Sequence, residues 1–154
     1  MILSGKRLNL LKTIEVMLPI NVNDLLEKNR VESNRIEFKE GWNPVRIYQS
    51  ICAFANDIDN LGGGYILVGV KEDNGKVVRP VCGLTEEELE DIQKKMIGFN
   101  NLIDPYYRPR TSIEPVDGKN IFVIWAPMGE ERPYAVPQDI TAKDKKYKYY
   151  IRSN

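Results

Sequence analysis

Polar and apolar residues alternate along the segment 35–39, which is typical of a strand with one buried face. The apolar face carries Ile36 and Phe38, and the opposite face carries Glu37 and Lys39. We therefore expect a carboxylate and an ammonium to lie together on the exposed face of this strand.

Apolar runs and turn dipeptides predict the rest of a sheet. Residues 65–70 are almost wholly apolar, which is typical of a central strand covered on both faces. The Asn-Gly dipeptide at 74–75 predicts a hairpin that pairs this strand with residues 76–81. The Asp-Gly dipeptide at 117–118 predicts a second hairpin further along the chain.

Two longer segments carry the start signals of helices. Asn43 and Pro44 supply an N-cap and a first helical residue, and Thr85 and Glu88 have the spacing of a capping box. The residues expected to face the core are Ile47, Ile51, Phe54 and Ala55 in the first helix and Leu89, Ile92, Met96 and Ile97 in the second. Together with the strands, these helices predict an α+β fold with one mixed, mostly antiparallel β-sheet and two or three packed helices.

The N-terminal segment, residues 1–20, has only a weak pattern. Met17 is a second candidate start, so we expect a leader here and a single domain over residues 21–154. That domain should open with a short helix capped by Asn23 or Asp24.

Composition narrows the class of protein. A chain of 154 residues with 42% hydrophobic and 29% charged residues has the size and balance of one soluble domain. The 22 basic residues equal the 22 acidic ones, so the net charge does not attract nucleic acid or an anionic membrane. Any such binding would require a local patch of positive charge. The absence of histidine excludes Ser-His-Asp and Cys-His catalysis and every histidine-containing metal site.

Cysteine usage and hydropathy indicate the compartment. Cys52 and Cys82 stand singly in apolar surroundings, and we expect both to be buried, reduced thiols. No apolar run reaches the ~18 residues of a membrane span, and the N-terminus lacks the hydrophobic block of a signal peptide. We therefore expect a cytoplasmic protein that does not enter a membrane.

Several short motifs in a fixed order carry a resemblance to a known family. They are ESNRIEFK at 32–39, ICAFAN at 51–56, GGGYILVGV at 62–70, RPY at 132–134 and YYIR at 149–152. Together they resemble the Schlafen AlbA-like domain, a family associated with DNA binding in bacterial regulators and Schlafen proteins. The resemblance implies an α+β fold and a nucleic-acid-binding role in a transcriptional regulator.

The resemblance also implies an alternative, enzymatic function. Nuclease-active Schlafen proteins use three carboxylates, of which two match Glu32 and Glu37, and the third falls on Asp73 or, alternatively, Glu72. Clustered carboxylates hold Mg²⁺ or Mn²⁺ against a phosphodiester, where the metal generates hydroxide. The alternative is thus a metal-dependent endonuclease resembling an RNase. The alternative to a metal site is that Glu37 and Lys39 form a solvated ion pair with no catalytic role.

The C-terminal third supplies a basic patch. Residues 131–154 carry six Lys and Arg against three Asp and Glu. The alternation over 146–152 predicts a strand that buries Tyr147, Tyr149 and Ile151 and points its lysines outward, where they would follow a phosphate backbone. The structural alternative is an edge strand whose lysines protect it from aggregation. We favour a DNA- or RNA-binding module without catalysis or cofactor. The expected phosphate contacts are Lys39, Arg108, Arg110, Lys148 and Arg152.

A protein-interaction module is the third interpretation. Exposed Trp42, Tyr106 or Tyr107 would anchor a partner, and an edge strand would pair two copies into a homodimer. For Trp42, which stands beside a helix start, the structural alternative is a local lid on the core.

Overall fold

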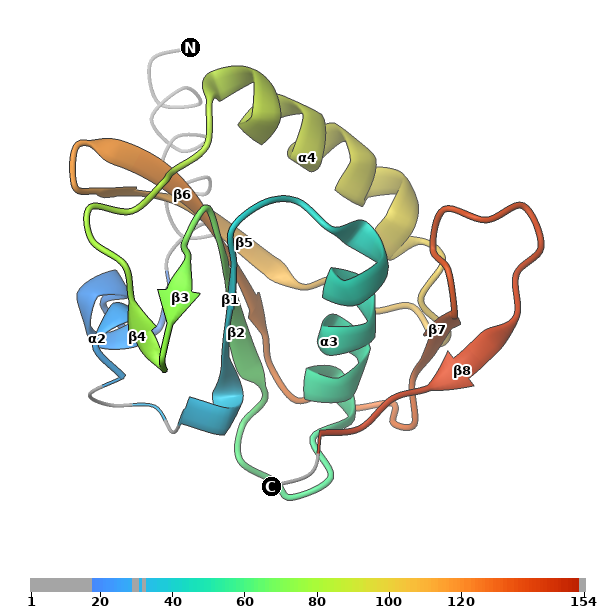
Figure 1. Ribbon diagram of the computed structural model, residues 1–154. Coiled ribbons are helices and arrows are strands. Elements are labelled where there is room, and N and C mark those ends of the chain that lie inside the picture. Colours follow the sequence, from blue (N-terminus) through green and yellow to red (C-terminus); the bar gives the residue numbers. More distant parts are fainter. Residues whose placement is uncertain (1–17, 29–30, 32, 153–154) are drawn as a thin grey trace, which may run out of the picture.

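The computed structural model describes residues 18–28, 31 and 33–152 and has a four-stranded sheet at its centre (Figure 1). In spatial order the strands are β1 (Ile36–Lys39), β2 (Gly64–Val68), β6 (Lys119–Ala126) and β5 (Arg110–Val116). β1 runs parallel to β2, and the other neighbouring pairs are antiparallel. This arrangement confirms the predicted α+β fold with a mixed, mostly antiparallel sheet.

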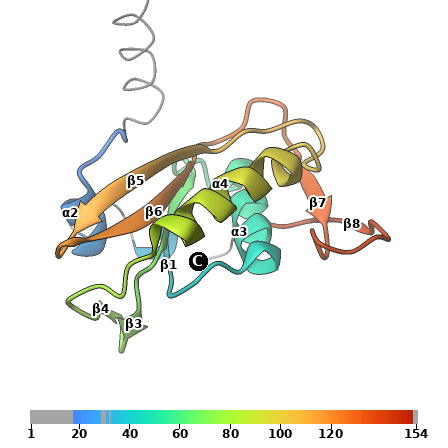
Figure 2. The same cartoon turned by 90° about the horizontal axis from the view of Figure 1, so that it is seen from above.

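Helices cover both faces of the sheet. α3 (Pro44–Asn56) and α4 (Glu86–Asn100) pack on one face, in a core that includes Ile66 from β2 (Figure 2). α2 (Val22–Leu26) covers the other face, in a core that includes Leu67. The side chains of β2 are buried on both sides, as the apolar run predicted.

The helix start signals are confirmed where they are local. Asn43 caps α3 by accepting a hydrogen bond from the Arg46 N–H, and Thr85 and Glu88 form both bonds of the capping box of α4. The cap of α2 is Asn21, not Asn23 or Asp24, because the Asn21 side chain accepts from the Asn23 N–H. Ile97 was predicted to face the core, but 71% of its surface is exposed on α4.

The hairpin at 74–75 is present, but its predicted pairing is wrong. Asn74 and Gly75 have positive φ angles of 50° and 78°, and they join β3 (Glu72–Asp73) to β4 (Lys76–Val77) in a separate two-stranded sheet. The central strand cannot continue into this hairpin because Gly69, at φ 97°, turns the chain after β2. The predicted hairpin at 117–118 is confirmed between β5 and β6.

The predicted burial along 146–152 is also wrong. The strand β8 (Tyr147–Tyr149) pairs with β7 (Ala135–Pro137) in a small arm beside α3 (Figure 1). Tyr147, Tyr149 and Ile151 are 42%, 68% and 57% exposed. Their side chains stay open because, in the part of the chain that the structure describes, β8 pairs with β7 alone and does not join the central sheet.

Of the two cysteines, one is where we expected it. Cys52 is buried, and burial raises the pKa of its thiol to about 11. Cys82 is exposed, contrary to the prediction, in the segment between β4 and α4. Among the described residues no helix is long and apolar enough to cross a membrane. The predicted leader falls mostly outside the described part of the chain, so its boundary stays a prediction.

Candidate nucleic-acid interface

A buried carboxylate fixes the loop between α3 and β2. Asp57 ends α3 in the left-handed conformation and accepts hydrogen bonds of 2.8–3.1 Å from the backbone N–H groups of Leu61, Gly62 and Gly63. Arg35 Nε donates to the Gly63 carbonyl at 2.7 Å. Two N–H groups of the glycine motif are therefore used inside the loop, where they position β2 and are not available to a phosphate.

Asn56 ties the C-terminal segment to the end of α3. Its Nδ2 donates to the carbonyls of Tyr134 (3.0 Å) and Tyr150 (2.8 Å), and its Oδ1 accepts from the Tyr134 N–H (2.6 Å). Arg132 Nη1 donates to the carbonyls of Asn56 and Asp57, both at 3.3 Å. The RPY and YYIR motifs thus close over the end of α3, and these contacts have a structural role.

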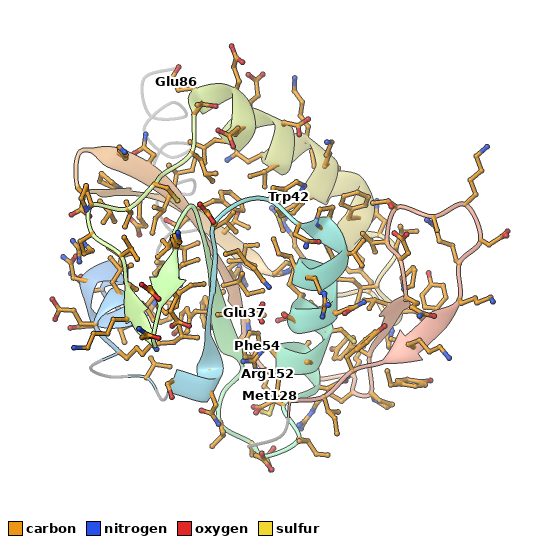
Figure 3. All side chains as sticks on the ribbon, viewed as in Figure 1. Glu37, Trp42, Phe54, Glu86, Met128 and Arg152 are labelled. Carbon is orange, nitrogen blue, oxygen red and sulfur yellow. The ribbon has the colours of Figure 1, made fainter. Side chains whose placement is uncertain are left out.

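Glu37 lies between β1 and α3, where it meets Arg152 (Figure 3). Its Oε1 accepts from Arg152 Nη1 at 3.3 Å, and the guanidinium carbon lies 4.6 Å from the centre of the Phe54 ring. Arg152 Nε also donates to the Asn34 carbonyl at 2.9 Å. The expected exposed pair with Lys39 is therefore replaced by a half-buried pair with Arg152, because the C-terminal segment lies over this face of β1.

An open groove of about 190 Å³ runs along β1, α3 and the C-terminal segment. Lys39, Arg46 and Arg152 line it with three cations, against the single carboxylate of Glu37. Arg46 was missed by the sequence analysis. A cation in the first turn of a helix opposes the helix dipole, so the stability of α3 alone does not favour arginine at this position.

The arm formed by β7 and β8 carries further cations and leads along the chain into the groove. Residues 143–152 carry five Lys and Arg against Asp144 alone. Lys148 lies on β8 between the two exposed tyrosines, and the chain continues from β8 into the residues that line the groove. We call the groove cations Lys39, Arg46 and Arg152, together with Lys148 of the arm, the basic strip.

The other two predicted phosphate contacts lie elsewhere. Arg110 begins β5, at the opposite edge of the sheet from β1, and its register opposite Trp125 places it on the face covered by α2. Arg108 lines a pocket beside α4. The structure thus brings Lys39 and Arg152 together and leaves Arg108 and Arg110 away from them.

The carboxylates of the nuclease hypothesis are spread over different elements. Glu37 pairs with Arg152, whereas Glu72 pairs with Lys28 at 3.0 Å in the hairpin that also carries exposed Asp73. Within residues 18–28, 31 and 33–152, no three His, Cys, Asp or Glu side chains gather as metal ligands. Glu32 lies outside the described residues, so the three-carboxylate site stays a prediction.

The three aromatic residues predicted to anchor a protein partner differ in their exposure. Trp42 is half-buried against the core beside α3, as its alternative interpretation as a local lid predicted. Tyr107 is buried, and its hydroxyl donates to the Pro127 carbonyl at 2.6 Å. Tyr106 is 60% exposed.

Comparisons with known proteins show a family to which this chain is similar and several similar solved structures. The family described as Schlafen, AlbA_2 matches residues 32–154. The solution structure of the N-terminal domain of a RecG-related protein from Nitrosomonas europaea, whose name places it with ATP-dependent DNA helicases, is 30% identical, with a TM-score of 0.60. That match covers 88% of this chain and 90% of the other.

Another similar structure is the DIP2311 protein from Corynebacterium diphtheriae, with 20% identity and a TM-score of 0.49. This match covers 96% of the present chain and 26% of DIP2311. No curated protein matches the chain.

Proposed function

Because this chain belongs to the Schlafen AlbA_2 family, we propose that it binds nucleic acid through the phosphate backbone. The similar RecG-related protein carries the name of a DNA helicase, which supports the same class of partner. The observation that carries the proposal is the basic strip, with the exposed rings of Tyr147 and Tyr149 beside it.

The chemistry of this surface fits a nucleic acid better than other polyanions. Lys and Arg side chains along a groove neutralise successive phosphates, and the release of counterions makes such binding depend on salt. Aromatic rings next to the cations stack on unpaired bases without reading their sequence. Since the whole chain has no net charge, this local excess of cations is what would attract the backbone.

Lys148 and Arg46 test the proposal, because neither side chain has a structural ion pair among the described residues. We expect the variant with Lys148→Ala and Arg46→Ala to bind nucleic acid more weakly. Each lost phosphate contact should reduce the slope of log affinity against log salt by about one. Fluorescence anisotropy with labelled oligonucleotides at several salt concentrations measures both quantities. Lys76→Ala, on exposed β4, is the matched control, and an unchanged slope in the double variant would contradict the proposal.

The narrower role that we infer is that of a transcriptional regulator, whose partner would be duplex DNA. The family resemblance supports this role, and the same binding assay tests it with duplex DNA, single-stranded DNA and structured RNA of equal length. A clear preference for duplex DNA would support a regulator. A preference for RNA would argue against it.

Metal-dependent cleavage is a second candidate, and a specific observation favours it. Glu37 Oε2 is buried and accepts no hydrogen bond from the described residues. Such an acceptor is costly unless a cation or another donor reaches it. The same oligonucleotides with Mg²⁺, Mn²⁺ or EDTA show whether cleavage occurs.

A further inference from the structure

A pocket of about 450 Å³ lies beside the C-terminal half of α4, away from the basic strip. Its size is within the range of about 300–1,000 Å³ that is typical of small-molecule sites. The residues that matter for its chemistry are Gln93, Ile97, Asn100, Asn101, Tyr106 and Arg108. The nucleic-acid interface described above uses none of them.

Asn100 is held so that it offers a hydrogen-bond donor. The Tyr48 hydroxyl donates to Asn100 Oδ1 at 2.7 Å. Tyr48 is fully buried, and burial raises the pKa of its phenol far above the ordinary value, so it stays a neutral donor. Asn100 lines the pocket, and with Oδ1 occupied its Nδ2 group is the part of the amide that is left to donate to a ligand, since it donates to no described residue. Gln93 and Asn101 add two further amides to the wall.

Two large side chains at the pocket are open to solvent. Ile97 on α4 is 71% exposed, and Tyr106 in the segment after α4 is 60% exposed. An exposed tyrosine ring is a surface on which a flat aromatic ligand stacks. Arg108 is the only charged side chain among those that line the pocket, so an anionic group would meet a cation without an opposing carboxylate in the wall.

We propose that this pocket binds a nucleotide whose base is unpaired. The base stacks on Tyr106 and takes hydrogen bonds from the amides of Asn100 and its neighbours, and the phosphate lies against Arg108. A base inside a duplex does not fit this chemistry, because its hydrogen-bonding edge is engaged and its faces are stacked. The inference rests on the proposed binding of nucleic acid for its setting, since the nucleotide would belong to an unpaired segment of the bound strand. It does not rest on the regulator role, whose partner is a duplex.

Titration with AMP, CMP, GMP and UMP tests the pocket separately from the basic strip. We expect saturable NMR shifts in the backbone amides of residues 93–111 with at least one of the four nucleotides. Tyr106→Ala and Arg108→Ala should each weaken that binding about fivefold or more, and Tyr106→Phe, which keeps the ring, should retain it. Asn100→Asp should also lose binding, because it keeps an acceptor for Tyr48 and replaces the donor.

Arg110→Ala is the matched control for Arg108→Ala. It removes the same charge two residues along the chain, on the face of the sheet covered by α2, and should leave mononucleotide binding unchanged. Equal losses in the two variants would overturn the assignment, and so would the absence of saturable shifts at the pocket.

Failure of the pocket and failure of the proposed function give different results. If oligonucleotides bind through Lys148 and Arg46 while all four mononucleotides leave the pocket unshifted, the pocket assignment alone is wrong. If mononucleotides bind at the pocket while no oligonucleotide binds at low salt, the proposed function is wrong and the pocket stands.

Discussion

At the scale of single residues, Asn56 holds together segments that are far apart in the sequence. Replacing it with alanine removes its hydrogen bonds to the Tyr134 N–H and to the carbonyls of Tyr134 and Tyr150, and among the described residues only the Tyr134 carbonyl keeps another donor, the Cys52 thiol at 3.2 Å. We expect Asn56→Ala to lower the free energy of unfolding by about 2–4 kcal/mol, because buried polar groups lose their hydrogen bonds. Urea denaturation measures this loss. Asn120→Ala, at an exposed position on β6, should change stability by less than about 0.5 kcal/mol. A similarly small loss for Asn56→Ala would contradict the anchoring role.

Arg152 makes structural contacts at the same place where we propose that it binds phosphate. It pairs with Glu37, stacks on Phe54 and bonds the Asn34 carbonyl, and it also lines the basic groove. Its removal therefore changes both the position of the C-terminal segment and the charge of the groove. For this reason Lys148 and Arg46 report on nucleic-acid binding more directly than Arg152 does.

At the scale of elements, the glycine motif sets how closely α3, its loop and the sheet approach each other. Gly63 has a positive φ of 83°, and a Cβ there would collide with the carbonyl oxygen of Ala126 at the end of β6. Gly62 has φ 95°, but a Cβ there would meet only the flexible end of Arg35, at 3.1 Å. A side chain at either position would therefore strain the backbone, but only a side chain at Gly63 would also collide with the backbone of β6.

We expect Gly63→Ala to lower the free energy of unfolding by at least about 3 kcal/mol, from backbone strain and overpacking together. Gly62→Ala should cost about 1 kcal/mol, since it carries the strain alone. Urea denaturation of the two variants compares them directly. Equal losses would mean that the contact with β6 does not limit this loop.

Local features of the elements were predictable from the sequence, and long-range ones were not. The caps at Asn43 and Thr85 and the turn at 117–118 depend on neighbouring residues, so their patterns identify them. The pairing of β2 with β1 and β6 joins segments that are distant in the sequence, so no local pattern predicts it. An Asn-Gly turn after an apolar run therefore suggested the wrong partner for β2.

The candidate site shows the same division between local and long-range information. The motifs pointed to Lys39 and Arg152, which the fold brings to one groove, although 113 positions separate them in the sequence. Alternation of Lys and Tyr predicted a strand at 146–152 but could not show that β8 has no core to face. The Glu37–Arg152 pair depends on where the C-terminal segment crosses β1, which only the assembled fold determines.

At the scale of the whole molecule, zero net charge conceals an uneven distribution. Residues 86–91, at the start of α4, carry five acidic side chains and no basic one, whereas residues 143–152 carry five basic side chains and one acidic one. Figure 1 shows the start of α4 far from β8. A polyanion would therefore be repelled from one end of the molecule and attracted to the other, which orients its approach to the basic strip.

Glu37 is the one carboxylate in the groove of the basic strip, and its charge opposes a phosphate there. If the groove binds the backbone, Glu37→Gln should strengthen binding about two- to fivefold at low salt, because it removes a repulsion of about 1 kcal/mol or less and frees Arg152 from its ion pair. If the carboxylate instead serves a nuclease, the same variant should lose all cleavage stimulated by Mg²⁺ or Mn²⁺.

Anisotropy in EDTA and gel analysis in Mn²⁺ separate these outcomes with one variant. Glu114→Gln, on the far edge strand β5, is the control for a general change in net charge and should leave both affinity and cleavage unchanged. Weaker binding by Glu37→Gln, with the fold intact, would mean that Glu37 contributes to the interface chiefly by positioning Arg152. The phosphate contacts would then depend on the ion pair between β1 and the C-terminal segment.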